Sequence, residues 1–179
     1  MNSNPGPLEG SWLLSPKVHV DSRGQFIESF QKDVFAKQTG LSINFVQDNE
    51  VFSKYGVVRG LHLQKAPYAQ AKLIRVVQGQ IYDVAVDLRA DSSTYGEWFG
   101  IVLSADNQTQ LFLPKGFAHG YSVLSERTIV QYKVDAPYSP QAESGIRFDD
   151  PDMGIDWKVD DLKISDKDQK LPFLKHLNP

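Results

Sequence analysis

A barrel with a polar interior is predicted most directly by the stretch Val57-Val58-Arg59-Gly60-Leu61-His62-Leu63-Gln64. Side chains alternate between the two faces of a strand, so His62 and Gln64 share a face with Val58. A buried polar group without a partner costs about 1 to 3 kcal/mol. Two polar side chains on the inner face of one strand therefore indicate a cavity lined by polar groups.

Arg59 lies on the opposite face if this alternation is strict, and there it would form a surface salt bridge. A bulge at Gly60 would instead redirect the strand and bring Arg59 to the same side as His62. The pattern leaves both arrangements open. A bulge at Gly60 is the feature that distinguishes them.

Further strand-like runs surround this stretch at short intervals, separated by turn residues, which is typical of a β-sandwich or barrel. They are Ile43–Asn49, Lys72–Val77, Ile81–Leu88, Trp98–Leu103, Gln110–Leu113, Gly120–Leu124 and Ile129–Val134. Upstream, a hairpin is expected from Lys17 to Phe30 around the turn at 21–24, and a short helix over Lys32–Thr39, followed by Gly40. The tail from Ala136 onward is turn-rich, and only a capped turn at 165–168 is predicted there.

Composition limits the classes of function. The 179 residues, 41% of them hydrophobic, suffice for one buried core, so we expect a single domain over residues 1–179. A net charge of −3 gives no general attraction for nucleic acid or an anionic membrane. The chain has no cysteine, which removes disulfides and thiol nucleophiles. Its polar start and its lack of a long apolar run predict a cytoplasmic protein.

Lys72 and Asp83 each share a strand face with aliphatic residues. The Lys72 ammonium could extend to solvent, or it could enter the cavity and stabilise an anion. Asp83 needs a partner such as Lys72 or a histidine, and we expect it to support other cavity residues. Tyr132 and Tyr138 flank a turn-prone segment, and their pattern alone fits core or rim positions.

The segment Pro114-Lys115-Gly116-Phe117-Ala118-His119 is similar to the Pro-x-Gly-x-x-His element of metal-binding double-stranded β-helix proteins. Those proteins take further ligands from a His-x-His pair, where this chain has His62-Leu63-Gln64. Glutamine is a poor substitute for imidazole as a ligand of first-row metals. The segment therefore indicates the fold and argues against a metal.

Several blocks in order resemble the dTDP-4-dehydrorhamnose 3,5-epimerase family, from about Val18 to Pro172. The blocks are Arg23-Gly24 with Phe26 and Glu28, Gln47-Asp48-Asn49, Arg59-Gly60-Leu61-His62, Gln70-Ala71-Lys72-Leu73, residues 83–89, residues 114–120, Tyr132-Lys133 and Lys167-Asp168. The resemblance implies a cupin-like jelly roll without cofactor or metal, usually a homodimer whose partners exchange strands. One departure is Arg147-Phe148-Asp149-Asp150, where many members have Trp-Asn-Asp.

The resemblance also implies residue roles. His62 would be the base, Asp168 would orient its imidazole, Tyr132 would be the acid on the opposite face of the sugar, and Lys72 would stabilise the enolate. Substrate contacts would come from Arg23, Phe26, Glu28, Gln47, Asn49, Arg59, Lys72, His119, Tyr138, Glu143 and Lys167.

The expected reaction is inversion at C3 and C5 of dTDP-4-dehydro-6-deoxy-D-glucose to give dTDP-4-dehydro-L-rhamnose. No hydride moves, and the chain shows no Gly-x-Gly-x-x-Gly loop for a nicotinamide. Two alternatives remain open: a C3-only epimerase or ketoisomerase of a related keto sugar, and a non-catalytic cupin that binds sugar nucleotides. Loss of the base or of its carboxylate partner would mark the non-catalytic form, and both residues are present.

Overall fold

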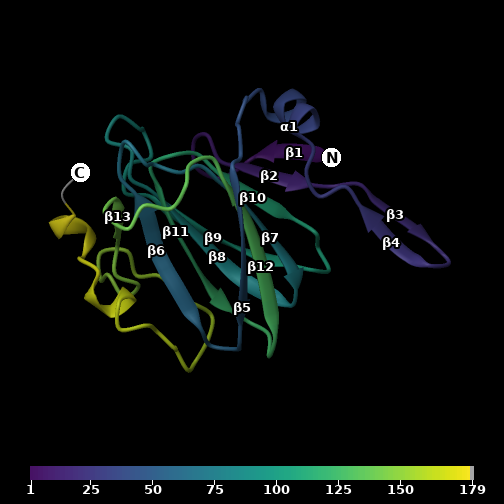
Figure 1. The fold of residues 1–179 in the computed structure, drawn as a ribbon. Coiled ribbons are helices and arrows are strands. Elements are labelled where there is room, and N and C mark those ends of the chain that lie inside the picture. Colours follow the sequence, from purple (N-terminus) through teal and green to yellow (C-terminus); the bar gives the residue numbers. More distant parts are fainter. Residues whose placement is uncertain (178–179) are drawn as a thin grey trace.

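The computed structural model describes residues 1–177, and most of its strands form two antiparallel sheets (Figure 1). The six-stranded sheet has the order β1-β2-β10-β7-β12-β5, and the five-stranded sheet has the order β13-β6-β11-β8-β9. Their strands are β1 (Asn2–Pro5), β2 (Trp12–Ser15), β5 (Gln47–Ser53), β6 (Val58–Gln64), β7 (Lys72–Gln78), β8 (Gln80–Asp87), β9 (Trp98–Ser104), β10 (Gln110–Leu113), β11 (Phe117–Val123), β12 (Thr128–Val134) and β13 (Glu143–Gly145). This arrangement is the predicted jelly roll.

The main core lies between the two sheets. Every second residue of β7 and β12 points inward from one sheet, as Ile74, Val76 and Val130 show, and meets residues of β8 and β11 such as Ile81 and Val123. All five are buried almost completely. The same alternation sends Lys72 and Asp83 into this interior, as their positions in the sequence predict.

Two smaller clusters cover the outer faces of the sheets. The tail after β13 folds over the five-stranded sheet and buries Ile146 and Trp157 against Val58 and Leu61. At the other face, Phe35 packs edge-on against Phe112 with ring centroids 5.3 Å apart. Each sheet therefore has one face in the common core and a second face that is partly covered.

Phe35 belongs to the helix α1 (Lys32–Thr39), which has the bounds that the sequence predicts. The Gln31 side chain accepts a hydrogen bond from the Val34 N–H at its start, and Gly40 ends it in the left-handed conformation with φ 74°. Two single-turn helices, η1 (Asp168–Lys170) and η2 (Leu174–His176), follow in the tail. None of the helices within residues 1–177 has the length and apolar character needed to span a bilayer.

Some sequence predictions were wrong at the ends of elements. β1 and β2 extend the six-stranded sheet upstream of the predicted hairpin, where no strand was expected. β5 covers Gln47–Ser53 rather than Ile43–Asn49, because Ile43 and Phe45 pack into the aromatic cluster around Phe35 instead of pairing with β12. The short strand β13 was not predicted at all. Residues 178 and 179 of the predicted domain lie outside the described residues.

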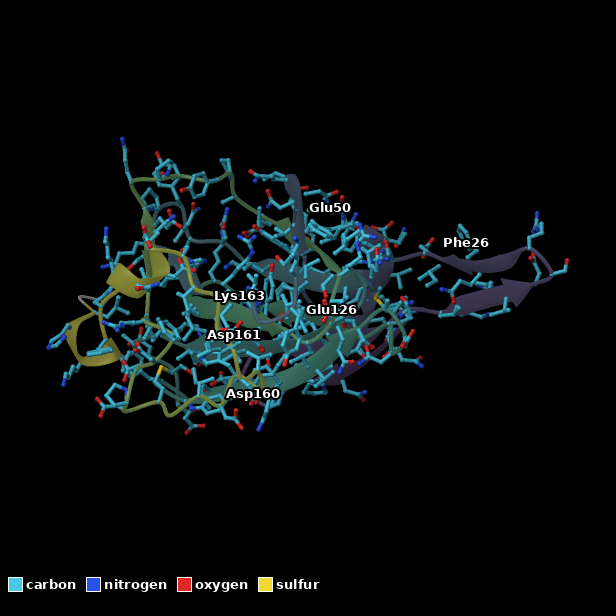
Figure 2. All side chains as sticks on the ribbon, turned by 90° about the horizontal axis from the view of Figure 1, so that it is seen from below. Phe26, Glu50, Glu126, Asp160, Asp161 and Lys163 are labelled. Carbon is cyan, nitrogen blue, oxygen red and sulfur yellow. The ribbon has the colours of Figure 1, made fainter. Side chains whose placement is uncertain are left out.

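The predicted hairpin is β3 (Val18–Asp21) and β4 (Gly24–Ile27), which form a two-stranded sheet of their own. It projects from one end of the barrel (Figure 1). Val20 and Phe26 on it are 77% and 69% exposed. Figure 2 shows Phe26 far from Glu50 and Lys163, which lie on the barrel. Large apolar side chains held so far from the core indicate a surface that meets another molecule.

Strand β6 has an irregularity at Gly60. His62 pairs with His119 and Arg59 pairs with Tyr121, so a step of three residues in β6 lies opposite a step of two in β11. Strict alternation is therefore wrong for the first half of the strand. Val58 packs outside with Leu61, while Arg59 is exposed along the cavity and its Nε donates to Ser53 Oγ of β5, 3.2 Å away. The bulge brings Arg59 to the same side as His62.

Only glycine fits at position 60. Its φ is 117°, and an added Cβ would lie 2.5 Å from the Gly120 Cα and 2.7 Å from the His119 carbonyl oxygen. We expect Gly60→Ala to lower the free energy of unfolding by about 3 kcal/mol, because strain and backbone overlap add. Urea denaturation measures the change. Gly96→Ala is the control, since Gly96 has φ 79° but open space around it, and it should cost only about 1 kcal/mol. Equal losses in the two variants would show that the packing at Gly60 contributes nothing.

Candidate active site

His62 and Asp168 form a close pair although they are far apart in the sequence. His62 Nε2 lies 2.8 Å from Asp168 Oδ1, and the Gly60 N–H donates to Asp168 Oδ2 at 3.2 Å. Asp168 is buried at the start of η1, where its own N–H is held by Ser165 Oγ at 3.1 Å. The capped turn predicted at residues 165–168 thus carries the carboxylate to the bulge of β6.

The charge of Asp168 fixes the state of His62. Burial raises the pKa of the Asp168 carboxyl, but the hydrogen bonds from His62, Gly60 and Ser165 outweigh burial and hold this pKa below its usual value. An ionised carboxylate can only accept hydrogen bonds, so His62 Nε2 donates to it, and in the neutral imidazole Nδ1 is then the nitrogen with the lone pair. His62 is therefore prepared to act as a base through Nδ1.

Lys72 lies inside the barrel beneath His62. Its side chain is buried, and Nζ donates to the His62 carbonyl oxygen at 3.1 Å. Burial lowers the pKa of Lys72 to about 8, against the opposing effect of Asp83 and Glu143. Of the two alternatives, extension to solvent is therefore wrong, and Lys72 points into the cavity region.

Tyr132 comes from the opposite sheet. It lies on β12, packs against the main core and is half-buried. Burial raises the pKa of its hydroxyl, Arg59 lowers it and Glu143 raises it again, which places both charges in its surroundings. A tyrosine with a raised pKa stays protonated at neutral pH, so it can serve as a proton donor.

The rim of the cavity holds a second polar group around Glu143 on β13. Glu143 accepts hydrogen bonds from Tyr138 Oη at 2.7 Å and from Lys167 Nζ at 2.5 Å. Nearby, the Gln47 amide donates to Asn49 Oδ1 at 2.8 Å, and its own carbonyl oxygen accepts from the Tyr138 N–H. The predicted contact residues of the strands and the tail therefore gather at one mouth of the barrel.

The cavity beside His62 has a volume of about 280 Å³. It is lined by Val57, Val58, Arg59, His62, Lys163, Ser165, Lys167 and Asp168. Three cationic side chains at one opening can bind an anionic group such as a diphosphate, and the planar guanidinium of Arg59 suits phosphate oxygens. His119, the remaining predicted contact, lies deeper, 3.0 Å from both oxygens of Asp83.

Some residues of the site were not predicted. Lys163 lines the cavity, and no local pattern marks it, because it stands in the irregular tail. Ser53 and Tyr121 lie next to Arg59, and both are buried. Gln64 has a structural role. Its Nε2 donates to the carbonyl oxygens of Tyr68 and Pro137, and its Oε1 accepts from the Ser139 N–H. It thereby holds the loop that carries Tyr138.

Three predicted contact residues are not brought to this cavity within the chain. Arg23, Phe26 and Glu28 belong to or follow the projecting hairpin, and the Arg23 guanidinium instead binds Asp21, with Nη2 2.6 Å from Oδ2. Within residues 1–177, no three His, Cys, Asp or Glu side chains gather in a way that could hold a metal ion.

Comparison with known proteins gives one consistent result. Residues 5–176 match the sequence profile described as dTDP-4-dehydrorhamnose 3,5-epimerase. A protein of that name from Methanothermobacter thermautotrophicus is 52% identical over 175 residues, covering 96% of this chain and 93% of its own length.

Solved structures that resemble this chain belong to epimerases of the same kind. The dTDP-4-dehydrorhamnose 3,5-epimerase of Bacillus anthracis, with TDP and pyrophosphate bound, superposes with a TM-score of 0.93 at 48% identity, covering 97% of this chain and 99% of that one. The dTDP-6-deoxy-D-glucose-3,5-epimerase of Legionella pneumophila, in complex with dTDP-4-keto-L-rhamnose, gives 0.95 at 39% identity, covering 99% and 94%. With the jelly roll, the paired histidine and the opposed tyrosine in place, this chain belongs to the dTDP-4-dehydrorhamnose 3,5-epimerase family.

Proposed function

We propose that this protein inverts C3 and C5 of dTDP-4-dehydro-6-deoxy-D-glucose to give dTDP-4-dehydro-L-rhamnose. The observation that carries the proposal is the placement of His62 and Tyr132. His62 comes from β6 of one sheet and Tyr132 from β12 of the other, and Arg59, which lines the cavity together with His62, also acts electrostatically on the Tyr132 hydroxyl. A sugar ring held between them would meet a base on one face and an acid on the other.

The first step is removal of a proton from a carbon next to the keto group. Such a proton is weakly acidic, so the base must be well placed and the enolate oxygen stabilised as charge develops. His62 Nδ1 takes the proton, and the Asp168 carboxylate stabilises the imidazolium that results. The buried Lys72 ammonium supplies a fixed positive charge for the enolate oxygen.

The second step returns a proton to the opposite face of the same carbon. Tyr132 donates it from the other sheet, and the electron pair of the enolate forms the new C–H bond while the ketone is restored. Solvent then returns the proton to Tyr132 and removes the one held by His62. The substrate keeps its oxidation state throughout, so its atoms and electrons balance without an external oxidant or reductant.

Isotope exchange separates the two steps. In deuterated water, His62→Ala should abolish incorporation of deuterium at C3 and C5 of dTDP-4-dehydro-6-deoxy-D-glucose, because no base remains. Tyr132→Phe should keep exchange but slow inversion by about 100-fold or more, since the opposite-face donor is lost. NMR of the sugar reports both quantities.

His176→Ala is the matched control, because His176 lies exposed on η2, outside the lining of the cavity, and it should leave exchange at the wild-type rate. Exchange at C3 alone in the wild type would reduce the activity to 3-epimerisation. Exchange at neither carbon would leave a binding protein. Full activity in His62→Ala would remove the role given to that residue.

We further propose that the working unit is a homodimer in which the hairpin of one copy enters the cavity of the other. The hairpin carries Arg23 and Phe26 away from its own barrel, and within residues 1–177 β5 is the edge strand of its sheet, next to β12. Exposed apolar residues occur on both parts, as Phe26 on the hairpin and Phe52 on β5 show. A free strand edge commonly accepts an extended segment of another chain.

A cytoplasmic location stays a prediction of the sequence.

Mixing two inactive variants tests this arrangement. Arg23→Ala and His62→Ala should each be inactive alone. After they are unfolded together and refolded, about one quarter of wild-type activity should return, because half of the dimers are mixed and one of their two sites is intact. The matched control replaces Arg23→Ala by Arg127→Ala in the mixture with His62→Ala. In that control the Arg127→Ala homodimers are already active before mixing. A mixture of Arg23→Ala and His62→Ala that stays inactive, or a protein that sediments as a monomer, would contradict the exchange.

A further inference from the structure

A fully buried carboxylate lies beneath the cavity. Asp83 on β8 has no exposed surface, and both of its oxygens lie 3.0 Å from His119 Nε2. The His119 side chain is itself only 8% exposed. Because a carboxylate can only accept, His119 Nε2 carries a proton and the ring is held in one orientation. His119 and Asp83 thus form a second histidine–carboxylate pair of the same kind as His62 and Asp168.

Asp83 and Lys72 belong to one buried cluster. The Lys72 Nζ donates to the His62 carbonyl oxygen, and His62 pairs across the sheet with His119, whose ring is bound to Asp83. Burial by itself disfavours the cationic form of Lys72, and Asp83 is the largest opposing influence, followed by Glu143. Glu143 is the weaker candidate as a counter-ion, since its two oxygens already accept hydrogen bonds from Tyr138 and Lys167 at the rim.

Apart from Glu143 at the rim, the groups around Lys72 in the described part of the chain do not offer a second anion. Its partners on the flanking strands are Leu113 of β10 and Val134 of β12, and neither titrates. The titratable or charged side chains that face this region from the packed strands are Asp83 of β8, Glu143 of β13, His62 and Arg59 of β6, His119 and Tyr121 of β11 and Tyr132 of β12. Asp83 is therefore the buried negative charge on which a cationic Lys72 depends.

Asp87, a second buried carboxylate on the same strand, differs from Asp83 in how its charge is paired. Asp87 is also without exposed surface, but it binds its own cation, with Arg89 Nη2 2.6 Å from Oδ2, and accepts further hydrogen bonds from Ser92 and Thr94. Its charge is satisfied locally, away from the cavity. Among the side chains of residues 1–177, the hydrogen-bond partner of Asp83 is His119 rather than an arginine.

We propose that Asp83 is a positioning residue that keeps Lys72 cationic and fixes the ring of His119 beneath the substrate. This proposal rests on the proposed function in one respect: Lys72 is taken to be the group that stabilises the enolate. The charge relation between the two side chains is a property of the folded protein and can be measured without substrate.

The decisive measurement is an NMR titration of the Lys72 Cε resonance in protein labelled with ¹³C-lysine, assigned by its absence in Lys72→Arg. In the wild type the resonance should titrate near pH 8. In Asp83→Asn, which keeps an oxygen that accepts from His119, the midpoint should fall by about one pH unit or more, because a nearby opposite charge is removed. Asp87→Asn is the matched control and should leave the midpoint unchanged.

Activity gives the second readout. The alkaline limb of kcat/KM should move to lower pH in Asp83→Asn by the same amount as the Lys72 midpoint, and stay in place in Asp87→Asn. An unchanged Lys72 midpoint in folded Asp83→Asn would overturn the proposal, whatever the activity. If Asp83→Asn does not fold, the smaller Asp83→Ser carries the same test. A midpoint that falls in a protein showing no isotope exchange would refute the proposed function and leave this inference standing.

Discussion

The carboxylate of Asp168, which bridges the His62 imidazole and the Gly60 N–H, is the contact on which the site depends. It joins the tail to the bulge of β6, and it determines which nitrogen of His62 can accept a proton. The bulge in turn exists only because Gly60 has no side chain where β6 approaches β11. One backbone irregularity thus presents the Gly60 N–H to the orienting carboxylate and brings Arg59 to the side of the strand that carries His62.

Around this contact the interior carries more charge than a core selected for stability alone would hold. Lys72, Asp83 and His119 are all buried, and each desolvated ionic group costs free energy unless it is paired. The pairs are two histidine–carboxylate contacts, and the Lys72 ammonium donates to the carbonyl oxygen of His62. Such an arrangement keeps a positive charge fixed where an enolate would form, and fixed charges in a water-poor site stabilise developing charge far better than mobile solvent does.

The barrel supplies the base, the acid and the cation, but part of the predicted contact set stands on the hairpin outside it. An exposed two-stranded sheet with apolar tips is marginal by itself in water. Its burial against a second copy would stabilise the hairpin and close the mouth of a cavity at the same time. Assembly and completion of the site are then one event, which couples the activity of each subunit to the presence of its partner.

The sequence by itself determined the elements and their inward faces. Period-two alternation placed His62, Lys72 and Asp83 in the interior, and Gly40 marked the end of the one regular helix, because these features depend on backbone geometry over a few residues. Tertiary structure decided which distant groups meet. Asp168 lies 106 residues from its imidazole partner, Tyr132 approaches from the opposite sheet, and the direction of Arg59 depends on a shift in register against β11. Register, bulges and the path of an irregular tail arise from packing across the whole barrel, so no local pattern in the chain encodes them.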